Sequence, residues 1–283
     1  MTGTLAPVAG SARERAALAG FWLLAFGVTW VVWVPRALES TGALDSRWAS
    51  GLGAGWTYGP AIAAVLTAAW VGRPALRELG ARLTRWRVGV RWWAVVLAGP
   101  AVLWLVAAGL HGVLGGRWAE VRPQAVEAGL VGLVPLFLVL ALTDGIGEEL
   151  GWRGFALPRL LRRRGPVVAS LLLGVVWAVW HAPLYWTSGA VFEGAPVWLL
   201  LVQLPACAVS YTWVFLHTGG SVLPGVALHS ALGLFGISLP RTDGDWRPYL
   251  LFVGLQVTVA AVLVVTGGLR LPPSDGGTGS TPD

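Results

Sequence analysis

Long apolar stretches, separated by short polar or glycine- and proline-rich segments, dominate the hydrophobic pattern of the chain. Each stretch holds about 20 residues, the length of helix that crosses about 30 Å of hydrocarbon. The apolar positions run continuously instead of alternating, which favours membrane helices over the strands of a barrel. The pattern therefore predicts an all-α polytopic membrane bundle of about eight transmembrane helices. The candidate spans are residues 17–35, 54–72, 92–115, 128–147, 167–187, 196–216, 221–239 and 248–268.

Polar ends flank this predicted bundle. We expect residues 1–16 to form a cytoplasmic N-terminal segment, residues 17–270 the transmembrane bundle, and residues 271–283 a disordered cytoplasmic tail rich in Pro, Gly, Ser and Thr. The first apolar stretch is too long for the core of a signal peptide, so we predict a membrane helix there. Tryptophans near span ends could form interfacial belts, with packing between helices as the alternative. The candidates are Trp30, Trp33, Trp92, Trp93 and Trp198.

Composition supports a membrane protein and suggests its orientation. Only 12% of the 283 residues are charged and the mean hydropathy is +0.68, whereas soluble domains carry about 25% charged residues. The net charge of +6 could indicate nucleic-acid binding, but all 20 basic residues are arginines and lie mostly between the apolar stretches. Fourteen of them fall on one predicted side, so both termini of this multi-pass cell-membrane protein should be cytoplasmic. The other six are Arg36, Arg47, Arg117, Arg122, Arg241 and Arg247.

The segment GIGEELGWRG, residues 145–154, places charges beside one of the most apolar stretches of the chain. In a helix, Glu149 and Arg153 are four residues apart and can form an ion pair. Glu148 is rotated by about 100° from Glu149 and points elsewhere. One carboxylate is then paired, and the other is free to act as a general base. The alternative is a salt bridge at the membrane edge together with a solvated glutamate.

Two histidines lie inside predicted spans, where ionisable residues are costly and often functional. His181 occurs in VWAVWHAP and His229 in PGVALHSA. A lone buried histidine usually has only a structural role, as a hydrogen-bond partner of a neighbouring helix. Together with the glutamates, however, the two histidines are suitable ligands for a zinc-like divalent metal, or suitable groups to bind water directly. We interpret His111 and His217 as structural, and the lone Cys207 excludes a multi-cysteine metal site.

These three elements, in this order and beside membrane segments, resemble those of the CPBP family, which contains the CAAX prenyl proteases and the bacterial Abi or bacteriocin-immunity proteins. The resemblance covers a core at about residues 137–236. It implies that Glu148 is the catalytic glutamate that polarises a water for attack on a peptide carbonyl. It also implies that Glu149 and Arg153 complete the first motif, and that His181 and His229 are the histidines of the second and third. Whether Glu148, His181 and His229 hold a metal stays open at this point.

The chain departs from the family pattern at two positions. Trp177 stands where the second motif commonly has Phe, which preserves an aromatic wall. Gly233 stands where the third motif commonly has Asn, and the chain contains no asparagine. In the family this asparagine is a candidate oxyanion donor, and loss of such a donor typically costs about 10²–10³ in rate. Ser230 could donate instead, although from another face of the helix.

The predicted spans leave the three motifs at different depths. Glu148 lies near the cytoplasmic end of residues 128–147, whereas His181 lies about 21 Å, and His229 about 12 Å, along their helices. The boundaries near residues 159–167 should therefore differ from those drawn. The segment 154–165, which contains FALPRLLRRR, could be an amphipathic interfacial turn or an ordinary basic loop.

Three functions follow as hypotheses. The first is an intramembrane endopeptidase that cleaves membrane-associated or lipidated peptides, with membrane lipid but no nucleic acid as a partner. The second is a catalytically weak or inactive member of the same family that acts in bacteriocin immunity or as a scaffold. The third is a small-solute transporter with Glu148 as a proton site, although no convincing repeat relates the two halves of the chain.

Overall fold

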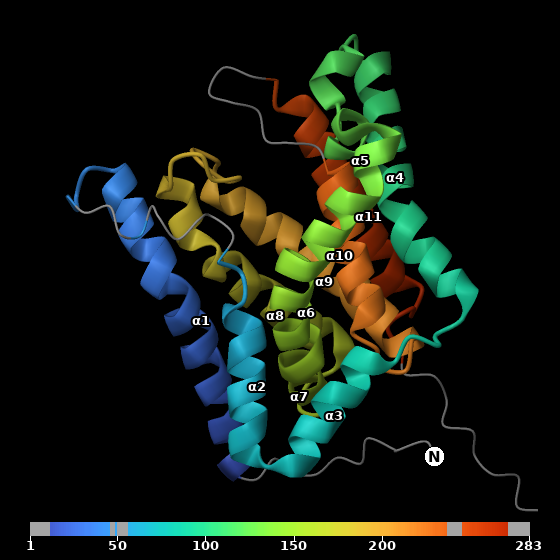
Figure 1. The fold of residues 1–283 in the computed structure, drawn as a ribbon. Helices are drawn as coiled ribbons and strands as arrows, with labels where there is room; N and C mark the ends of the chain where they lie inside the picture. The colour runs from blue at the N-terminus through green and yellow to red at the C-terminus, as the bar shows by residue number, and fades with distance from the viewer. Residues whose placement is uncertain (1–11, 46–48, 50–55, 237–244, 271–283) are drawn as a thin grey trace, which may run out of the picture.

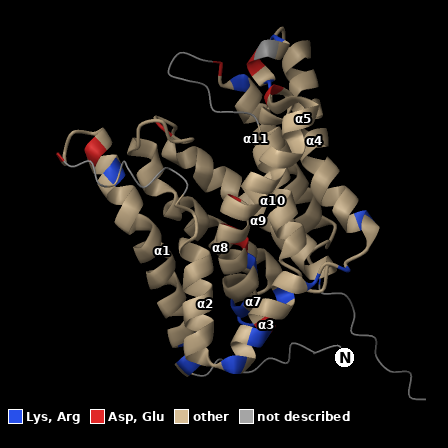
Figure 2. Ribbon diagram, viewed as in Figure 1, with Lys and Arg blue, Asp and Glu red and all other residues tan. Residues whose placement is uncertain are grey.

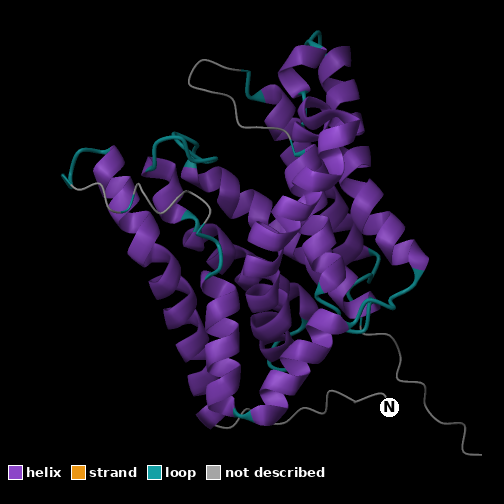
Figure 3. Cartoon of the chain, in the orientation of Figure 1, coloured by secondary structure: helices purple, strands orange, loops and turns teal. Residues whose placement is uncertain are grey.

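The computed structural model describes residues 12–45, 49, 56–236 and 245–270. Within these ranges the regular structure is helical and contains no strand (Figure 3). The all-α membrane fold is thus confirmed. The predicted tail, residues 271–283, lies outside the described residues. Of the predicted N-terminal segment, residues 12–16 are described, and they already belong to the first helix.

The helices follow one another with short connections (Figure 1). Two 3₁₀ turns, η2 (Trp118–Val121) and η5 (Ala182–Trp186), and two π-helical turns, η3 (Ala141–Gly145) and η4 (Trp152–Ala156), lie among them. The α-helices are α1 (Ala12–Ser40), α2 (Gly59–Val71), α3 (Arg73–Thr84), α4 (Val90–Val113), α5 (Gln124–Leu140), α6 (Ile146–Gly151), α7 (Leu157–Leu161), α8 (Pro166–Trp180), α9 (Val197–His217), α10 (Leu223–Phe235) and α11 (Arg247–Val265).

Six of the described helical stretches are long and apolar enough to cross a membrane, so the predicted number of eight is not confirmed. The two remaining predicted spans correspond to α2 and α10, each of which has 13 residues. A helix of this length covers about 20 Å, less than the hydrocarbon thickness. Both short helices are instead largely buried within the protein.

Helix pairs build the bundle around one main core. α1 packs on α2, α8 on α9, and α10 on α4 and α5, while α11 packs on α4 and α9. The main core is formed mostly by residues of α1, α2, α8 and α9 together with the region from α6 to α7. Figure 1 shows α6 in the middle of this assembly, beside α2. The segment that carries the two glutamates is therefore interior.

The prediction for the fourth span was wrong in its extent. Residues 124–161 form a helical stretch of 38 residues, kinked at Gly129, that comprises α5, η3, α6, η4 and α7. Hydropathy ended the span at 147 because the charged motif lowers it there. In the structure these charges are buried, so the helix continues and Glu148 lies well inside it. The extended helix brings Glu148 within 3.9 Å of His229, although the predicted boundaries placed them at different depths.

Residues 154–165 are neither an interfacial turn nor an ordinary loop. Most of this segment is helix, and in α7 the residues Leu157, Pro158, Arg159 and Leu160 are buried. The helix remains buried despite its arginines because Glu14 of α1 lies 3.3 Å from Arg159 and 3.1 Å from Arg162. The partner carboxylate comes from a segment more than 140 positions away, which local sequence could not reveal.

Two of the tryptophans predicted at interfaces are packed inside the protein. Trp33 lies with its ring 4.5 Å from that of Trp180, and Trp92 lies 5.0 Å from Trp213, measured between ring centroids. Both Trp33 and Trp92 are buried, whereas Trp198 is 56% exposed. Packing between helices is therefore the role of Trp33 and Trp92.

Candidate active site

Close helix packing buries the first motif. Glu148 and Glu149 belong to the six residues of α6, between the π turns η3 and η4. Gly151 allows α2 to approach so closely that a Cβ there would lie 2.4 Å from Cβ of Pro60. The two carboxylates are consequently almost fully buried. π turns inside α-helices are frequent at functional sites, which fits a specialised role for this segment.

Glu149 and Arg153 form the ion pair that their spacing predicts. Arg153 Nη1 donates to Glu149 Oε1 over 2.8 Å, and the two side chains are 2% and 0% exposed. The guanidinium also lies over two aromatic rings, 4.5 Å from the centroid of Trp177 and 3.9 Å from that of Tyr211. A buried charge requires such partners because it has lost its water. The pair thus forms a rigid, electrically neutral base for the site.

Glu148 points away from this ion pair, as its position on the helix predicts. It is not without partners, however, because the indole N–H groups of Trp152 and Trp177 both donate to its Oε2. Its other oxygen, Oε1, lies 3.9 Å from Nε2 of His229. No hydrogen bond reaches Oε1 from the described residues. Two donors on one oxygen therefore fix the carboxylate and leave the other oxygen available.

His229 connects the two glutamates. Its Nδ1 lies 3.0 Å from Glu149 Oε1. Because an ionised carboxylate only accepts hydrogen bonds, Nδ1 carries the hydrogen and Nε2 of the neutral ring is an acceptor. This Nε2 faces Glu148. The His229 side chain is 18% exposed and the Glu148 side chain 3%, so the site is most accessible on the histidine side.

His181 lies one aromatic ring away from this cluster. It follows α8, and its Nδ1 donates to the carbonyl oxygen of Trp177 over 2.9 Å. The ring of Trp177 lies 6.2 Å from that of His181 and 5.9 Å from that of His229. His181 is otherwise packed against aromatic rings, including those of Trp180 and Phe192. Trp177 therefore stands between the two histidines and contacts both.

The predicted metal set does not form a compact group of ligands. Among the described residues, one group of three offers ligand atoms within 4.8 Å of one another, and it consists of His111, Glu120 and Asp245, far from the first motif. Glu148, His181 and His229 form no such group. Two indole donors also occupy one oxygen of Glu148. In this arrangement the three residues do not fit a shared metal, and we assign no step to one.

A neighbouring side chain crowds the position of the missing asparagine. A Cβ added at Gly233 would lie 3.1 Å from Cδ1 of Leu140, at the end of α5. Ser230 does not replace the missing donor, because its hydroxyl donates to the carbonyl oxygen of Val226 in its own helix. The third motif therefore supplies His229 but no additional donor from these two positions.

Sequence reasoning missed the aromatic residues that hold the charged ones. Trp152 lies four residues after Glu148, a helical spacing that could have indicated its indole as a donor. Tyr211 lies beneath Arg153 and 6.3 Å from the ring of His229, but it belongs to α9. Its position in the sequence gives no local signal, since only the tertiary fold brings it to the site.

Comparisons with known proteins match the part of the chain that carries the three motifs. Residues 130–235 match the family described as "Type II CAAX prenyl endopeptidase Rce1-like". The chain is also 28% identical over 178 residues to the CAAX prenyl protease 2 of Methanococcus maripaludis. That alignment covers 60% of this chain and 64% of the relative, which is less than two thirds of the relative's length. The family match contains all three motifs, so the core of the chain is similar to the CAAX prenyl endopeptidases.

Proposed function

We propose that the protein is an intramembrane endopeptidase that cleaves membrane-associated or lipidated peptides. One observation carries the proposal: Oε1 of Glu148 and Nε2 of His229 face each other across 3.9 Å. The opposite side of each group is held, Glu148 by two indoles and His229 by Glu149. A water that bridges two acceptors at hydrogen-bond length suits this separation. The family match supports the same activity.

Glu148 acts as the general base in this proposal. The bound water donates one hydrogen to Oε1 of Glu148 and the other to Nε2 of His229, which directs an oxygen lone pair toward the incoming peptide carbonyl. The oxygen adds to the carbonyl carbon while Glu148 takes the proton. The C–N bond then breaks, and Glu148 returns this proton to the leaving amine. The products are one carboxylic acid and one amine, so the net reaction consumes one water.

Glu149 and Arg153 position this machinery. Glu149 holds the hydrogen of His229 on Nδ1, which keeps the lone pair of Nε2 toward the water. Arg153 neutralises Glu149, so the charge of Glu148 is not opposed by a second unpaired carboxylate. The roles of Glu149 and Arg153 are therefore to orient and balance groups that touch the substrate.

His181 is the residue whose role is most constrained by its hydrogen bond. Its Nδ1 donates to Trp177, so Nε2 of the neutral ring can only accept. It can stabilise a developing oxyanion only as the doubly protonated imidazolium. Because burial among aromatic rings favours the neutral ring, we assign His181 to shaping the aromatic wall beside the site and not to oxyanion stabilisation.

A proteolysis assay in liposomes tests the proposal. We expect the wild type to cleave a farnesylated peptide or a hydrophobic transmembrane peptide, with fragments detected by mass spectrometry. Glu148→Gln should reduce the rate by at least about 10²-fold, since it removes the general base. Glu127→Gln is the matched control, because Glu127 is exposed on α5 of the same helical stretch. Equal rates in Glu148→Gln and the wild type would refute the proposal.

The glycine at position 233, crowded by Leu140, favours one second candidate, a catalytically weak member of the family that binds peptides without efficient turnover. Leu140 crowds the position that the Cβ of an asparagine would take. In the Leu140→Ala background, Gly233→Asn should then raise cleavage markedly above that of Leu140→Ala alone, because it restores a donor. If both variants and the wild type bind the peptide but never cleave it, the binding function is preferred.

A further inference from the structure

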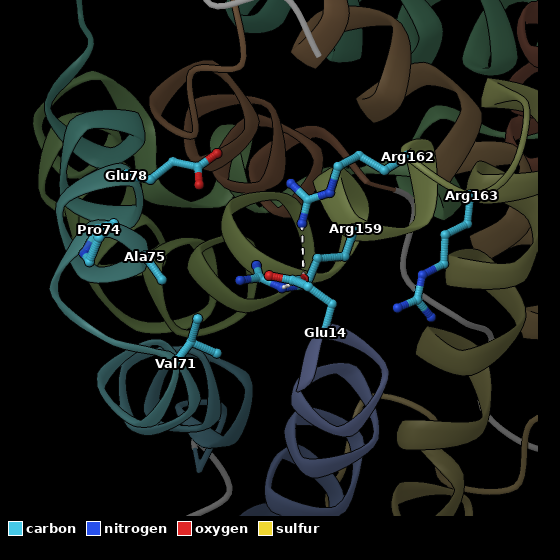
Figure 4. A pocket seen from close by; sticks show the side chains of 8 residues that line it. All are labelled: Glu14, Val71, Pro74, Ala75, Glu78, Arg159, Arg162 and Arg163. Carbon is cyan, nitrogen blue, oxygen red and sulfur yellow. Dashed lines mark hydrogen bonds and ion pairs between the residues drawn. The ribbon is translucent and has the colours of Figure 1, made fainter. Parts of the chain in front are cut away.

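A second polar site lies away from the motif residues, at the arginine-rich end of the helices. A cavity of about 330 Å³ opens between the start of α1, the junction of α2 and α3, and the end of α7. Figure 4 shows Arg159 and Arg162 converging on Glu14 of α1, with Glu78 on the opposite side. Neither the family motifs nor the proposed hydrolysis uses these residues.

Arg159 is a buried cation whose hydrogen-bonding capacity is not filled. The residue is 6% exposed, and its Nη1 donates to the carbonyl oxygen of Phe155. Its Nε lies 3.3 Å from Oε2 of Glu14 but has no aligned hydrogen bond. Arg159 thus lines the cavity as a buried cation whose Nε contacts Glu14 without an aligned hydrogen bond, and an unfilled buried donor is costly.

The cavity carries more positive than negative charge. Glu78 is occupied by Arg82, which lies 2.6 Å away and does not line the cavity. Glu14 contacts two arginines, because Arg162 Nη2 binds the same Oε2 atom that contacts Arg159, and a third arginine, Arg163, also lines the cavity. Guanidinium groups offer several donors each in a planar fork that suits phosphate oxygens. One carboxylate cannot fill the donors of three arginines.

The place of the cavity indicates where the anion comes from. It lies where the membrane helix α1 begins and where the helical stretch 124–161 ends. Its remaining lining is apolar and includes Val71, Pro74 and Ala75. Basic pockets between helices at a membrane surface suit the phosphate of a lipid with its glycerol and upper acyl chain beside apolar side chains.

We propose that this cavity binds the phosphate headgroup of an anionic phospholipid. Arg159, Arg162 and Arg163 hold the phosphate, and Glu14 is the internal carboxylate that the headgroup partly displaces. Since α7 continues directly from the helix that bears Glu148, the lipid also fastens the cytoplasmic end of that helix to α1. The site is distinct from the proposed peptidase site and does not depend on it.

Native mass spectrometry of the full chain in neutral detergent tests this site. The delipidated protein is titrated with phosphatidylglycerol and, in parallel, with phosphatidylcholine of the same acyl chains. We expect tighter binding of phosphatidylglycerol and a loss of about 25-fold in Arg162→Gln/Arg163→Gln, about fivefold for each arginine removed. Glu14→Gln should bind phosphatidylglycerol more tightly than the wild type, a gain that misfolding cannot produce.

The control removes the same charge on the same side of the protein. Arg73→Gln/Arg77→Gln changes two exposed arginines of α3 that do not line the cavity, and its affinity should stay within about twofold. An equal loss of affinity for phosphatidylglycerol in both double variants would show that the lipid is attracted by the charged surface in general. It would contradict a specific site in the cavity. Equal binding of the two lipids would overturn it as well. If glycerol 3-phosphate binds as tightly as phosphatidylglycerol, the ligand of the cavity is a soluble phosphate and the lipid proposal is wrong.

Discussion

At the scale of single residues, the candidate site depends on the buried carboxylate of Glu149, which contacts both Arg153 and His229. Oε1 of Glu149 accepts from Arg153 and from His229, whereas Oε2 is buried without a hydrogen-bond partner among the described residues. Such a carboxylate is stable only while its cation is present. The aromatic rings of Trp177 and Tyr211 in turn hold that cation in place.

Removal of the cation should therefore destabilise the fold strongly. We expect Arg153→Ala to lower the free energy of unfolding by about 3–5 kcal/mol, because Glu149 is left as an unpaired buried charge. SDS titration in mixed micelles, followed by circular dichroism, measures this quantity. Adding Glu149→Gln to Arg153→Ala should recover a substantial part of the loss. The exposed Arg77→Ala is the control, and a loss of equal size there would contradict the explanation.

Local spacing explains which of these residue-level features could be predicted. The pairing of Glu149 with Arg153, and the different direction of Glu148, follow from helical geometry within five residues of sequence. The donors to Glu148 and the ring beneath Arg153 come partly from α8 and α9, so they required the tertiary fold. The predicted metal set stays a prediction without a matching geometry, because helical spacing does not specify how far apart separate helices place their side chains.

At the scale of helices, two glycines allow a close approach of neighbouring backbones. Gly151 of α6 faces Pro60 of α2, and a Cβ at Gly174 of α8 would lie 2.3 Å from Cα of Pro205 in α9. Backbone atoms cannot turn aside as a flexible side chain can. Small residues at helix crossings are a common means of close packing in membranes, where tight van der Waals contact drives association.

Alanine at these glycines should separate the helices. We expect Gly151→Ala and Gly174→Ala each to cost about 1–3 kcal/mol through overpacking. Gly99→Ala in α4 and Gly254→Ala in α11 are matched controls, because nothing lies within 4 Å of their added Cβ. The unfolding free energies of the four variants test whether the loss of stability comes from overpacking. The explanation is untenable if the two pairs lose the same stability.

A cluster at the other end of the bundle connects α4, η2 and the start of α11. Glu120 accepts from the backbone N–H of Arg117 and from Nε2 of His111, and Arg247 pairs with Asp245 and donates to the carbonyl oxygen of Leu114. The hydrogen bond from the backbone of Arg117, together with that from His111, lowers the pKa of Glu120 from 4.5 to about 2.

This lowered pKa predicts that the stability of the fold depends on pH in the acidic range. The unfolded glutamate binds a proton more readily than the folded one, so the contribution of Glu120 is complete above about pH 4.5 and disappears toward pH 2. The melting temperature in detergent should fall across this window. Glu120→Gln should flatten that part of the profile, whereas Glu127→Gln should leave it unchanged. An unaltered profile in Glu120→Gln would exclude the cluster as its source.

Helix extents were predictable only where hydropathy and burial agree. The long apolar helices on the outside, such as α4 and α11, lie close to their predicted ranges. The stretch through α6 and α7 was cut short because its charges are compensated by residues distant in sequence, including Glu14. The short helices α2 and α10 were drawn too long, since a helix enclosed by protein need not match the membrane thickness.

At the scale of the whole molecule, charge is distributed unevenly between the two ends. Figure 2 shows arginines gathered around the ends of α2, α3 and α7, at the lower end of the view. The opposite end carries both signs near η2 and the start of α11. The positive-inside rule predicts that the arginine-rich end faces the cytoplasm.

Cysteine labelling can establish this orientation. Cys207 is buried and supplies an unreactive background for single new cysteines. A membrane-impermeant maleimide should label Val191→Cys in intact cells but leave Arg77→Cys unlabelled until the cells are opened. Both positions are exposed in the protein, so access depends on the side of the membrane. The reverse pattern would invert the topology.

Because of the two π turns around α6, the number of residues in this segment determines how the side chains of the site are oriented. A π turn spans one more residue than an α turn, so the deletion of a single residue can restore ordinary helix there. Each such change would rotate the flanking helices about their axis by about 100° relative to each other. A deletion in η3 would turn α5 with respect to the glutamates, and one in η4 would turn Arg159 away from Glu14. Relatives that carry the same motif letters but a different count of residues between 141 and 156 would therefore aim their carboxylates in different directions.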